Sequence, residues 1–238
     1  MISPNYAGFG GVYKIYEKVY KSLGNPENMK KDVLERKTSI LLAIFVTALI
    51  LANILGSKVT TIFGIVTSVG IFAYPITFLM TDVVEEVRGK KVALQFFYAG
   101  IIAIVLSLIL VWIGIAMPPA SFYANNEAYK IVFSNSIRIL IASLVAFMLG
   151  QYHDIWAFQF WKKKTHGKAL WLRNNASTIV SQFIDTTIFT FIAFFMVTPE
   201  FTVARIFMMI LPYWGLKVAW AVADTPAVYI LVHWMKKD

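Results

Sequence analysis

The stretch from Val92 to Met117 contains no charged residue and is long enough to cross a bilayer as a helix. A spanning helix takes about 20 predominantly apolar residues. The rest of the chain has the same character, since 58% of its 238 residues are hydrophobic and only 15% are charged. Soluble domains have about 45–50% apolar and about 25% charged residues. The sequence therefore predicts an all-α integral membrane protein.

Six segments of spanning length can be placed along the chain, which predicts a six-transmembrane-helix bundle. The expected spans are Ser39–Gly56, Ile71–Val87, Val92–Met117, Val132–Trp161, Trp171–Val197 and Ile206–Trp234. The fourth is too long for one perpendicular helix at about 1.5 Å per residue, so it must tilt, overshoot the bilayer or break near Gly150. Pro226, beside Asp224, predicts a break in the last span. Residues 58–70 are rich in β-branched side chains and predict a small hairpin or an irregular connection.

The segment before the first span has a different character. Residues 1–37 are polar to amphipathic and lack the basic-then-apolar pattern of a cleavable signal peptide. From Val12 to Gly24 the apolar residues share one helical face, which predicts a short helix that lies on lipid headgroups or packs on the protein. We therefore expect a cytoplasmic or interfacial amphipathic segment at 1–37 and a transmembrane domain at 38–238.

The basic residues indicate how the bundle is oriented. Of the 22 lysines and arginines, 17 fall in the N-terminal tail, in Arg88–Lys91, in Lys162–Arg173 and at the C-terminal end. Six spans place all four segments on one side of the membrane, and basic loops face the cytoplasm. Both termini are therefore expected to be cytoplasmic. The net charge of +9 is then explained by loops at an anionic membrane face, and we expect no nucleic-acid partner.

The fifth span carries a polar stripe along an otherwise apolar stretch, Trp171 to Phe191. On a helix that advances about 100° per residue, four polar side chains fall within about 60° of one another, namely Asn174, Thr178, Ser181 and Asp185. A charged acid at the bilayer centre costs about 2.5–3.5 kcal/mol on insertion scales. The stripe should therefore face the bundle interior, a water-filled cavity or a ligand. The alternative is a seam of interhelical hydrogen bonds without a ligand.

Two other spans carry charges at membrane depth. In the second span, Asp82 lies deeper than Glu85 and Glu86, which are candidates either for the site or for interfacial pairing with Arg88 and Lys90. In the last span, Lys217 and Asp224 lie two turns apart, about 10 Å along the axis. They should therefore find partners on other helices, and Asp185, Asp82 or a ligand are the candidates for Lys217.

His153 and Asp154 in the fourth span suggest a proton relay, but adjacent residues on a helix do not face each other.

The polar groups of these spans, with interleaved aromatic rings, define a candidate substrate site. Its expected members are Asp185, Asp224, Gln182, Lys217, Asp82, Asn174, Trp220, Phe78, Glu85 and Ser181. Carboxylates and carboxamides hydrogen-bond in a plane, and aromatic rings offer flat apolar faces. Such a set favours a planar, multiply hydrogen-bonding heterocycle over an inorganic ion. The chain has no cysteine, HExxH or Walker motif, so we expect no metal, cofactor or catalytic residue.

Several stretches resemble motifs of the queuosine precursor transporter family, a group of six-helix membrane proteins among the vitamin-uptake transporters. They are LANILGSK at 51–58, YPITFLMTDVVEEVRGKK at 74–91, LRNNASTIVSQFIDTTIF at 172–189 and DTPAVY at 224–229. The resemblance covers essentially Ser39 to Trp234. It implies a multi-pass protein of the cell membrane that imports 7-cyano-7-deazaguanine and 7-aminomethyl-7-deazaguanine, precursors of modified bases in transfer RNA.

Three hypotheses follow. The first is a transporter for a 7-deazaguanine, in which an acid such as Asp185 or Asp224 accepts the base-edge donors. The second is a substrate-binding subunit of an ATPase-driven vitamin or nucleobase uptake complex. The small-residue ridge Ala48-Ala52-Gly56 would then dock the partner, or a second copy in a homodimer. The third is an intramembrane enzyme that uses Asp82, Asp185 or His153, but no paired catalytic motif supports it.

Overall fold

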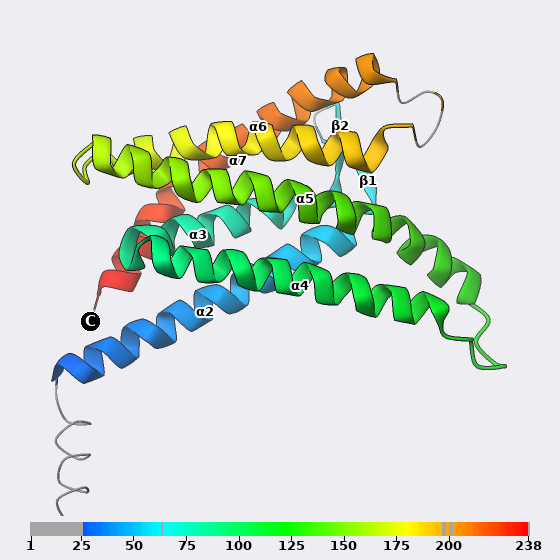
Figure 1. The fold of residues 1–238 in the computed structure, drawn as a ribbon, viewed down its shortest axis with the longest axis horizontal. Coiled ribbons are helices and arrows are strands. Elements are labelled where there is room, and N and C mark those ends of the chain that lie inside the picture. The colour runs from blue at the N-terminus through cyan, green and yellow to red at the C-terminus, as the bar shows by residue number, and fades with distance from the viewer. Residues whose placement is uncertain (1–25, 63, 197–198, 200–201, 238) are drawn as a thin grey trace, which may run out of the picture.

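The computed structural model describes residues 26–62, 64–196, 199 and 202–237. In chain order the elements are α2 (Pro26–Leu55), β1 (Val59–Ile62), β2 (Ile65–Ser68), η1 (Val69–Phe72), α3 (Tyr74–Arg88), α4 (Lys90–Ala116), α5 (Asn126–Lys164), α6 (Leu170–Phe194) and α7 (Val203–Lys236). The long helices lie side by side in one bundle (Figure 1). The amphipathic helix expected between Val12 and Gly24 lies outside the described residues.

Among the described residues, five helices are long and apolar enough to cross a membrane, namely α2, α4, α5, α6 and α7. This confirms the prediction of an all-α membrane protein. The second expected span corresponds to η1 followed by α3, and α3 has only 15 residues. Asp82 and Glu85 on α3 are buried inside the bundle, because charged side chains are excluded from the lipid.

The small hairpin expected at 58–70 is present. Its strands pair in antiparallel register, with Val59 opposite Ser68 and Ile62 opposite Ile65. Gly64 in the turn has a φ of +79°, a conformation that glycine adopts without a steric cost. The hairpin brings the chain directly from α2 into η1 and α3.

The break considered as one alternative near Gly150, and the break expected at Pro226, do not occur. α5 is one helix of 39 residues that passes through Gly150, and α7 is one helix that contains Pro226. A proline removes one backbone donor, and neighbouring helices can compensate for that loss in a membrane bundle. The prediction of a break beside Asp224 was therefore wrong. α2 also starts earlier than the expected first span, at Pro26.

Gly150 has a different function in the fold, since it lets α5 and α6 approach closely. A Cβ atom at this position would lie 2.9 Å from the Cβ of Asp185 and 3.3 Å from the carbonyl oxygen of Ser181. Both distances are too short for ordinary van der Waals contact. The absence of a side chain at Gly150 therefore brings the polar stripe of α6 against α5.

The small-residue ridge of α2 is also used inside the chain. Ala48 and Ala52 are buried, at 6% and 8% exposed. A Cβ at Gly70 would lie 2.5 Å from the backbone oxygen of Ala52, so the start of η1 packs directly on this ridge. The sequence suggested that this ridge docks a partner or a second copy. In the structure it is covered by the chain itself, so a homodimer would need another face.

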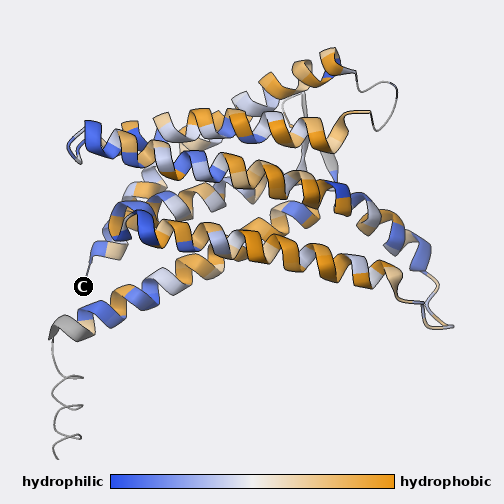
Figure 2. Ribbon diagram, viewed as in Figure 1, coloured by the Kyte–Doolittle hydropathy of each residue, from blue (hydrophilic) through white to orange (hydrophobic). Residues whose placement is uncertain are grey.

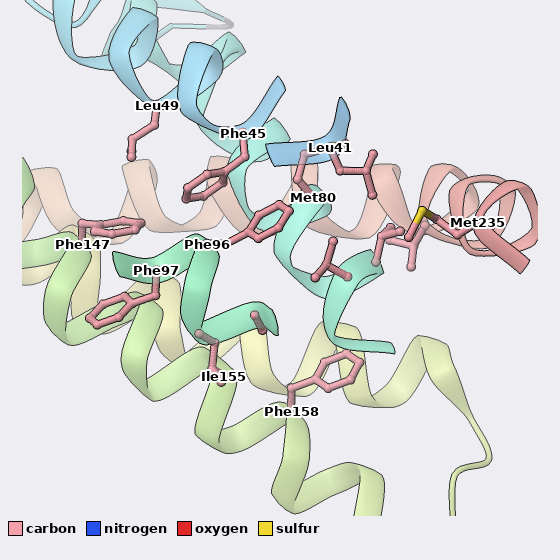
Figure 3. Close-up of a cluster of buried hydrophobic side chains, with 14 of the residues drawn as sticks. Leu41, Phe45, Leu49, Met80, Phe96, Phe97, Phe147, Ile155, Phe158 and Met235 are labelled. Atoms are coloured by element: carbon pink, nitrogen blue, oxygen red, sulfur yellow. The ribbon is translucent and has the colours of Figure 1, made fainter. Parts of the chain in front are cut away.

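The apolar core lies where α2, α3, α4 and α5 meet (Figure 3). Phe45 and Phe96 have ring centroids 5.6 Å apart, and Phe97 stacks on Phe147 at 5.7 Å. The outer face of α4 is apolar as well, since Ile102 and Trp112 are 66% and 63% exposed. Exposed apolar surface of this extent is suited to lipid.

The two ends of the bundle differ in polarity. The start of α2, the α3–α4 and α5–α6 turns and the end of α7 all lie at one end, on the left of Figure 1, where Figure 2 shows strongly hydrophilic residues. The hairpin and the α4–α5 connection lie toward the other end. The basic segments identified in the sequence are thus gathered together in space.

The close approach at Gly150 can be tested against a matched helical glycine. Gly150→Ala should lower the melting temperature in detergent, because its Cβ overlaps α6. Gly215→Ala should leave the melting temperature unchanged or raise it, because nothing lies within 4 Å of its added Cβ and alanine is favoured over glycine in helices by about 1 kcal/mol. Equal effects of the two substitutions would contradict the packing described.

Candidate functional site

A buried ion pair joins α6 and α7 in the bundle interior. Lys217 Nζ donates to Asp185 Oδ2 at 2.8 Å, and the Lys217 side chain is 5% exposed. The hydroxyl of Tyr74 on α3 donates to the other oxygen, Asp185 Oδ1, at 2.5 Å. The expectation that Lys217 finds its partner on another helix is thus confirmed, and three helices are tied together at one carboxylate.

Two aromatic rings complete the surroundings of the lysine. Its Nζ lies 4.3 Å from the ring centroid of Tyr74 and 4.8 Å from that of Tyr213. A cation held over aromatic faces is stabilised by their electron-rich surfaces. Neither tyrosine was among the predicted site residues. The signal was present for Tyr213, which precedes Lys217 by one helical turn.

A pocket lies between α3, α6 and α7 on one side of this ion pair. Its lining residues are Tyr74, Pro75, Phe78, Leu79, Asp82, Asn174, Thr178, Gln182, Lys217, Ala221, Asp224 and Val228. Six of the predicted site residues are therefore brought together: Phe78, Asp82, Asn174, Gln182, Lys217 and Asp224. The cavity volume is only about 20 Å³, enough for about one water molecule.

Four buried polar atoms in this pocket have no hydrogen-bond partner among the described residues. They are Asp82 Oδ1, Asn174 Oδ1, Thr178 Oγ1 and Gln182 Oε1. An unpaired buried polar group costs about 1–3 kcal/mol, and folded proteins satisfy most of them. Four in one pocket therefore indicate that a ligand or water supplies the missing hydrogen bonds. Three of the four are carbonyl or carboxylate oxygens, which favours a ligand rich in donors.

A second cavity, of about 30 Å³, lies on the other side of the ion pair. It is bounded by α2, η1, α5, α6 and α7, and its lining includes Asn53, Ser143, Asp185 and Tyr213. Tyr74 and Lys217 line both cavities. The ion pair with its tyrosine thus separates the two cavities.

Four of the predicted site residues are not in the lining of the pocket, and three of them face other neighbours. Glu85 accepts a hydrogen bond of 2.7 Å from Gln159 on α5, and Trp220 packs edge-on against Phe72 at 6.3 Å. Ser181 faces α5 and donates to Asp154 at 2.9 Å. The structure therefore does not bring these three residues to the pocket, because the pattern of one helix does not tell which neighbour each face meets.

Asp185 is buried beside the pocket, but both of its oxygens are already engaged.

Ser181, His153 and Asp154 lie close together but do not form a catalytic triad. His153 Nδ1 and Asp154 Oδ1 both approach the Ser181 hydroxyl, at 3.1 Å and 2.9 Å. In a triad the acid instead orients the histidine. The Ser181 hydroxyl therefore bridges His153 and Asp154, which are neighbours in the sequence of α5 but do not face each other on that helix.

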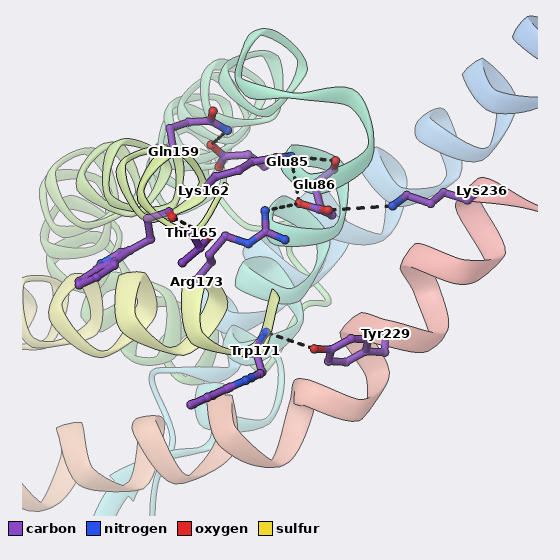
Figure 4. A network of polar contacts seen from close by, with 10 residues as sticks. Glu85, Glu86, Gln159, Lys162, Thr165, Trp171, Arg173, Tyr229 and Lys236 are labelled. Atoms are coloured by element: carbon purple, nitrogen blue, oxygen red, sulfur yellow. Dashed lines mark hydrogen bonds and ion pairs between the residues drawn. The ribbon is translucent and has the colours of Figure 1, made fainter. Parts of the chain in front are cut away.

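A cluster of charges joins four helices at the basic end of the bundle (Figure 4). Glu86 on α3 lies 2.9 Å from Lys162 on α5 and 3.0 Å from Arg173 on α6, and Lys236 on α7 approaches to 4.0 Å. The side chain of Arg173 is 1% exposed. Glu86 is thus an ion-paired acid, as one alternative held, but its partners come from other helices and are not Arg88 and Lys90.

Arg138 on α5 makes a structural contact at the end of α6. Its guanidinium donates to the carbonyl oxygens of Ile192 and Phe195, each at 2.8 Å. These carbonyls end α6, where cations are favoured by the helix dipole.

Most of the chain matches a known protein family. Residues 68–231 match the family model described as "Putative vitamin uptake transporter". The chain belongs to this transporter family. The matched region begins at β2 and contains every residue that lines the pocket between α3, α6 and α7.

Two relatives narrow the family further. The chain is 32% identical over 163 residues to a probable queuosine precursor transporter of Bacillus subtilis (strain 168), covering 68% of this chain and 71% of the relative. It is 28% identical over 148 residues to the queuosine precursor transporter of Escherichia coli (strain K12), covering 60% of this chain and 62% of that relative. No solved structure matches the chain. The relatives of this family member are transporters and not enzymes.

The buried pair can be tested with single and double substitutions in this transporter. Lys217→Met and Asp185→Asn each leave one partner without its counterpart, and breaking a buried pair costs about 3–5 kcal/mol. The double variant removes both charges and should recover most of the loss in thermal unfolding in detergent. Tyr74→Phe, which removes one hydrogen bond and no charge, should cost less than either single change. A double variant that shows the full sum of both losses would contradict the pairing.

Proposed function

We propose that the protein imports 7-deazaguanine precursors of queuosine or archaeosine across the cell membrane, with the pocket between α3, α6 and α7 as the substrate site. Family membership and the two named relatives support the transport of a queuosine precursor. The observation that carries the proposal is the group of unpaired polar atoms on Asp82, Asn174, Thr178 and Gln182 in this pocket.

The chemistry of a 7-deazaguanine is complementary to these atoms. Its base edge offers N–H and exocyclic NH₂ donors, which an acid accepts in the plane of the ring. Asp82 supplies that acid, and the carboxamides of Asn174 and Gln182 can both accept and donate. Phe78 lines the same pocket and offers an apolar face for the ring. Asp224 is the further acid at this site.

The role of Asp185 differs from the one expected from the sequence. Because Tyr74 and Lys217 occupy both of its oxygens, Asp185 positions Lys217 at the pocket and does not itself accept the base edge. This assigns the recognition of the donors to Asp82, the carboxylate in the pocket with an unpaired oxygen.

The pocket must widen to admit a substrate. A cavity of about 20 Å³ takes about one water molecule, whereas a deazaguanine is a fused two-ring system. The described arrangement therefore corresponds to a closed state of the transporter. Opening it toward the basic end would require separation of the helices that Glu86, Lys162 and Arg173 hold together.

We place the six helices α2–α7 across the membrane with both termini in the cytoplasm. η1 and α3 together form one of the six crossings, and we assign the transporter domain to 38–238, with its first helix α2 beginning earlier, at Pro26. The described basic segments lie at one end of the bundle, which supports this orientation.

Labelling from each side of the membrane tests the orientation. Asn125 precedes α5 and Thr165 follows it, so cysteines introduced at these positions should react with impermeant reagents from opposite sides. Reaction of both from the same side would overturn the proposed topology.

The ATPase-driven alternative is not favoured, since both relatives are named as transporters. Purification from the native membrane addresses it directly. An ATPase module that remains bound through purification would revive it, and transport by the purified chain alone would exclude it.

The substrate site can be tested with two adjacent asparagines on α6. Asn174 lines the pocket and has an unpaired oxygen. Asn175 lies outside it and donates to the backbone of Trp171 and to Thr225. Asn174→Ala should weaken the binding of 7-cyano-7-deazaguanine to the purified protein by about 10- to 100-fold, the loss of about 1.5–3 kcal/mol. Asn175→Ala should leave the affinity within about twofold.

A change in the ligand tests the same site, with binding to the purified protein measured by calorimetry. The analogue that lacks the 2-amino group should bind the wild-type protein far more weakly, because Asp82 then loses a donor. Equal affinities for the two ligands, or equal effects of the two asparagine substitutions, would contradict the proposed site.

A further inference from the structure

Two buried carboxyl groups meet at the edge of the proposed substrate pocket. Asp82 on α3 is 2% exposed, and Asp154 on α5 is 0% exposed. Their carboxyl groups lie close enough together to interact directly. Asp82 Oδ1 and Asp154 Oδ2 each lack a hydrogen-bond partner among the described residues. The two acids therefore come from different helices, α3 and α5, and share one buried position.

Contact between two carboxyl groups requires a proton. Carboxylate oxygens only accept hydrogen bonds, and two carboxylates that share a buried site do not both ionise. The pair then titrates as one unit that retains a shared proton. The hydroxyl of Ser181 donates to Asp154 at 2.9 Å, which satisfies one oxygen of the pair but brings no positive charge.

The surrounding charges do not neutralise this pair. The charged or titratable groups around the pair and its pocket include Tyr74 and Glu85 on α3, Lys90 on α4, His153 and Lys162 on α5, Arg173 and Asp185 on α6, and Lys217 and Asp224 on α7. α2 has no charged residue between Thr38 and Leu55. Lys217 is bound to Asp185, and Lys162 to Glu86. Among the ion pairs of the described residues, none includes Asp82 or Asp154.

We propose that Asp82 and Asp154 form the proton-binding site that couples substrate import to a proton gradient. The inference rests on the proposed function, because Asp82 also lines the substrate pocket. When the pocket is open to water, both carboxyl groups are hydrated and can ionise. Closing the pocket removes the water, so that one proton must be bound between the two acids before it closes.

The substrate and the proton then have distinct places in the pair. The substrate donates to the free oxygen of Asp82, and the pair retains the proton that lies between the two acids. Both enter from the outside, and both are released when the pocket opens to the cytoplasm. One proton is carried with each substrate molecule. The energy of import comes from the gradient, in agreement with the absence of any Walker motif from the sequence.

Reconstitution into vesicles separates this inference from the proposed function. Counterflow of labelled against unlabelled 7-cyano-7-deazaguanine, without a pH gradient, reports transport alone. Accumulation under an inside-alkaline gradient, followed with an internal pH dye, reports coupling. With one proton per substrate, a gradient of one pH unit should drive accumulation by up to about tenfold, accompanied by substrate-dependent entry of protons.

Asp154→Asn replaces the acid by a neutral group of the same shape and resembles its protonated form. This variant should retain counterflow, but its accumulation ratio should fall to about 1, without proton entry. Asp154→Glu, which restores an ionisable group, should accumulate substrate. Glu127→Gln makes the same chemical change at an exposed position of α5 and should behave like the wild-type protein.

The inference is overturned if wild-type vesicles show counterflow without proton entry, a readout that does not depend on the stability of any variant. It is also overturned if Asp154→Asn still accumulates substrate together with protons. Wild-type vesicles that show no counterflow would instead reject the proposed function, and the coupling would fall with it.

Discussion

The arrangement of the bundle interior depends on one requirement, which is that a charge buried in a membrane protein must be paired. Lys217 meets it by binding Asp185 at 2.8 Å, and Tyr74 donates to the same carboxylate. Separating the two ions in this environment would strand both. The contact therefore fixes α3, α6 and α7 relative to one another, and those three helices form the walls of the substrate pocket.

The Lys217–Asp185 pair also explains why the other polar groups of the pocket are left without an ionic partner. Because Lys217 is held by Asp185, it does not neutralise Asp82, which stays in the pocket with an unpaired oxygen. Gly150 contributes as well. Because it has no side chain, α5 can approach α6, and Asp154 then lies within hydrogen-bonding distance of Ser181. In the proposed function, recognition of a donor-rich base and retention of a proton depend on the same packing. The charged cluster around Glu86 joins α3, α5, α6 and α7 at the basic end (Figure 4).

The sequence predicted the properties that depend on one segment at a time. Apolar length located the spanning helices, β-branched residues around Gly64 indicated the hairpin, and the isolation of Lys217 on its own helix required a partner elsewhere. Contacts between helices could not be predicted in this way. Helical periodicity shows which residues share a face, but the neighbour of that face is decided by the packing of the whole bundle.

Expected site residues that lie away from the pocket, and one expected helix break that does not occur, illustrate this limit. Glu85 and Ser181 lie on polar faces, as expected, yet these residues meet α5 and not the pocket. Trp220 shares a helix with Lys217 but packs against Phe72. Pro226 did not break α7, because loss of one backbone donor is small beside the packing of a long helix. The pairing of Asp82 with Asp154 joins residues far apart in the chain, and no local pattern indicates it.

The central claim is that this chain carries a 7-deazaguanine across the membrane, and cellular uptake measures it most directly. Cells that cannot make the precursor should be supplied with labelled 7-cyano-7-deazaguanine, with and without the protein. The account predicts that label enters, and reaches transfer RNA, only in cells that contain the protein, and that unlabelled deazaguanine competes for entry. Equal uptake with and without the protein would contradict it.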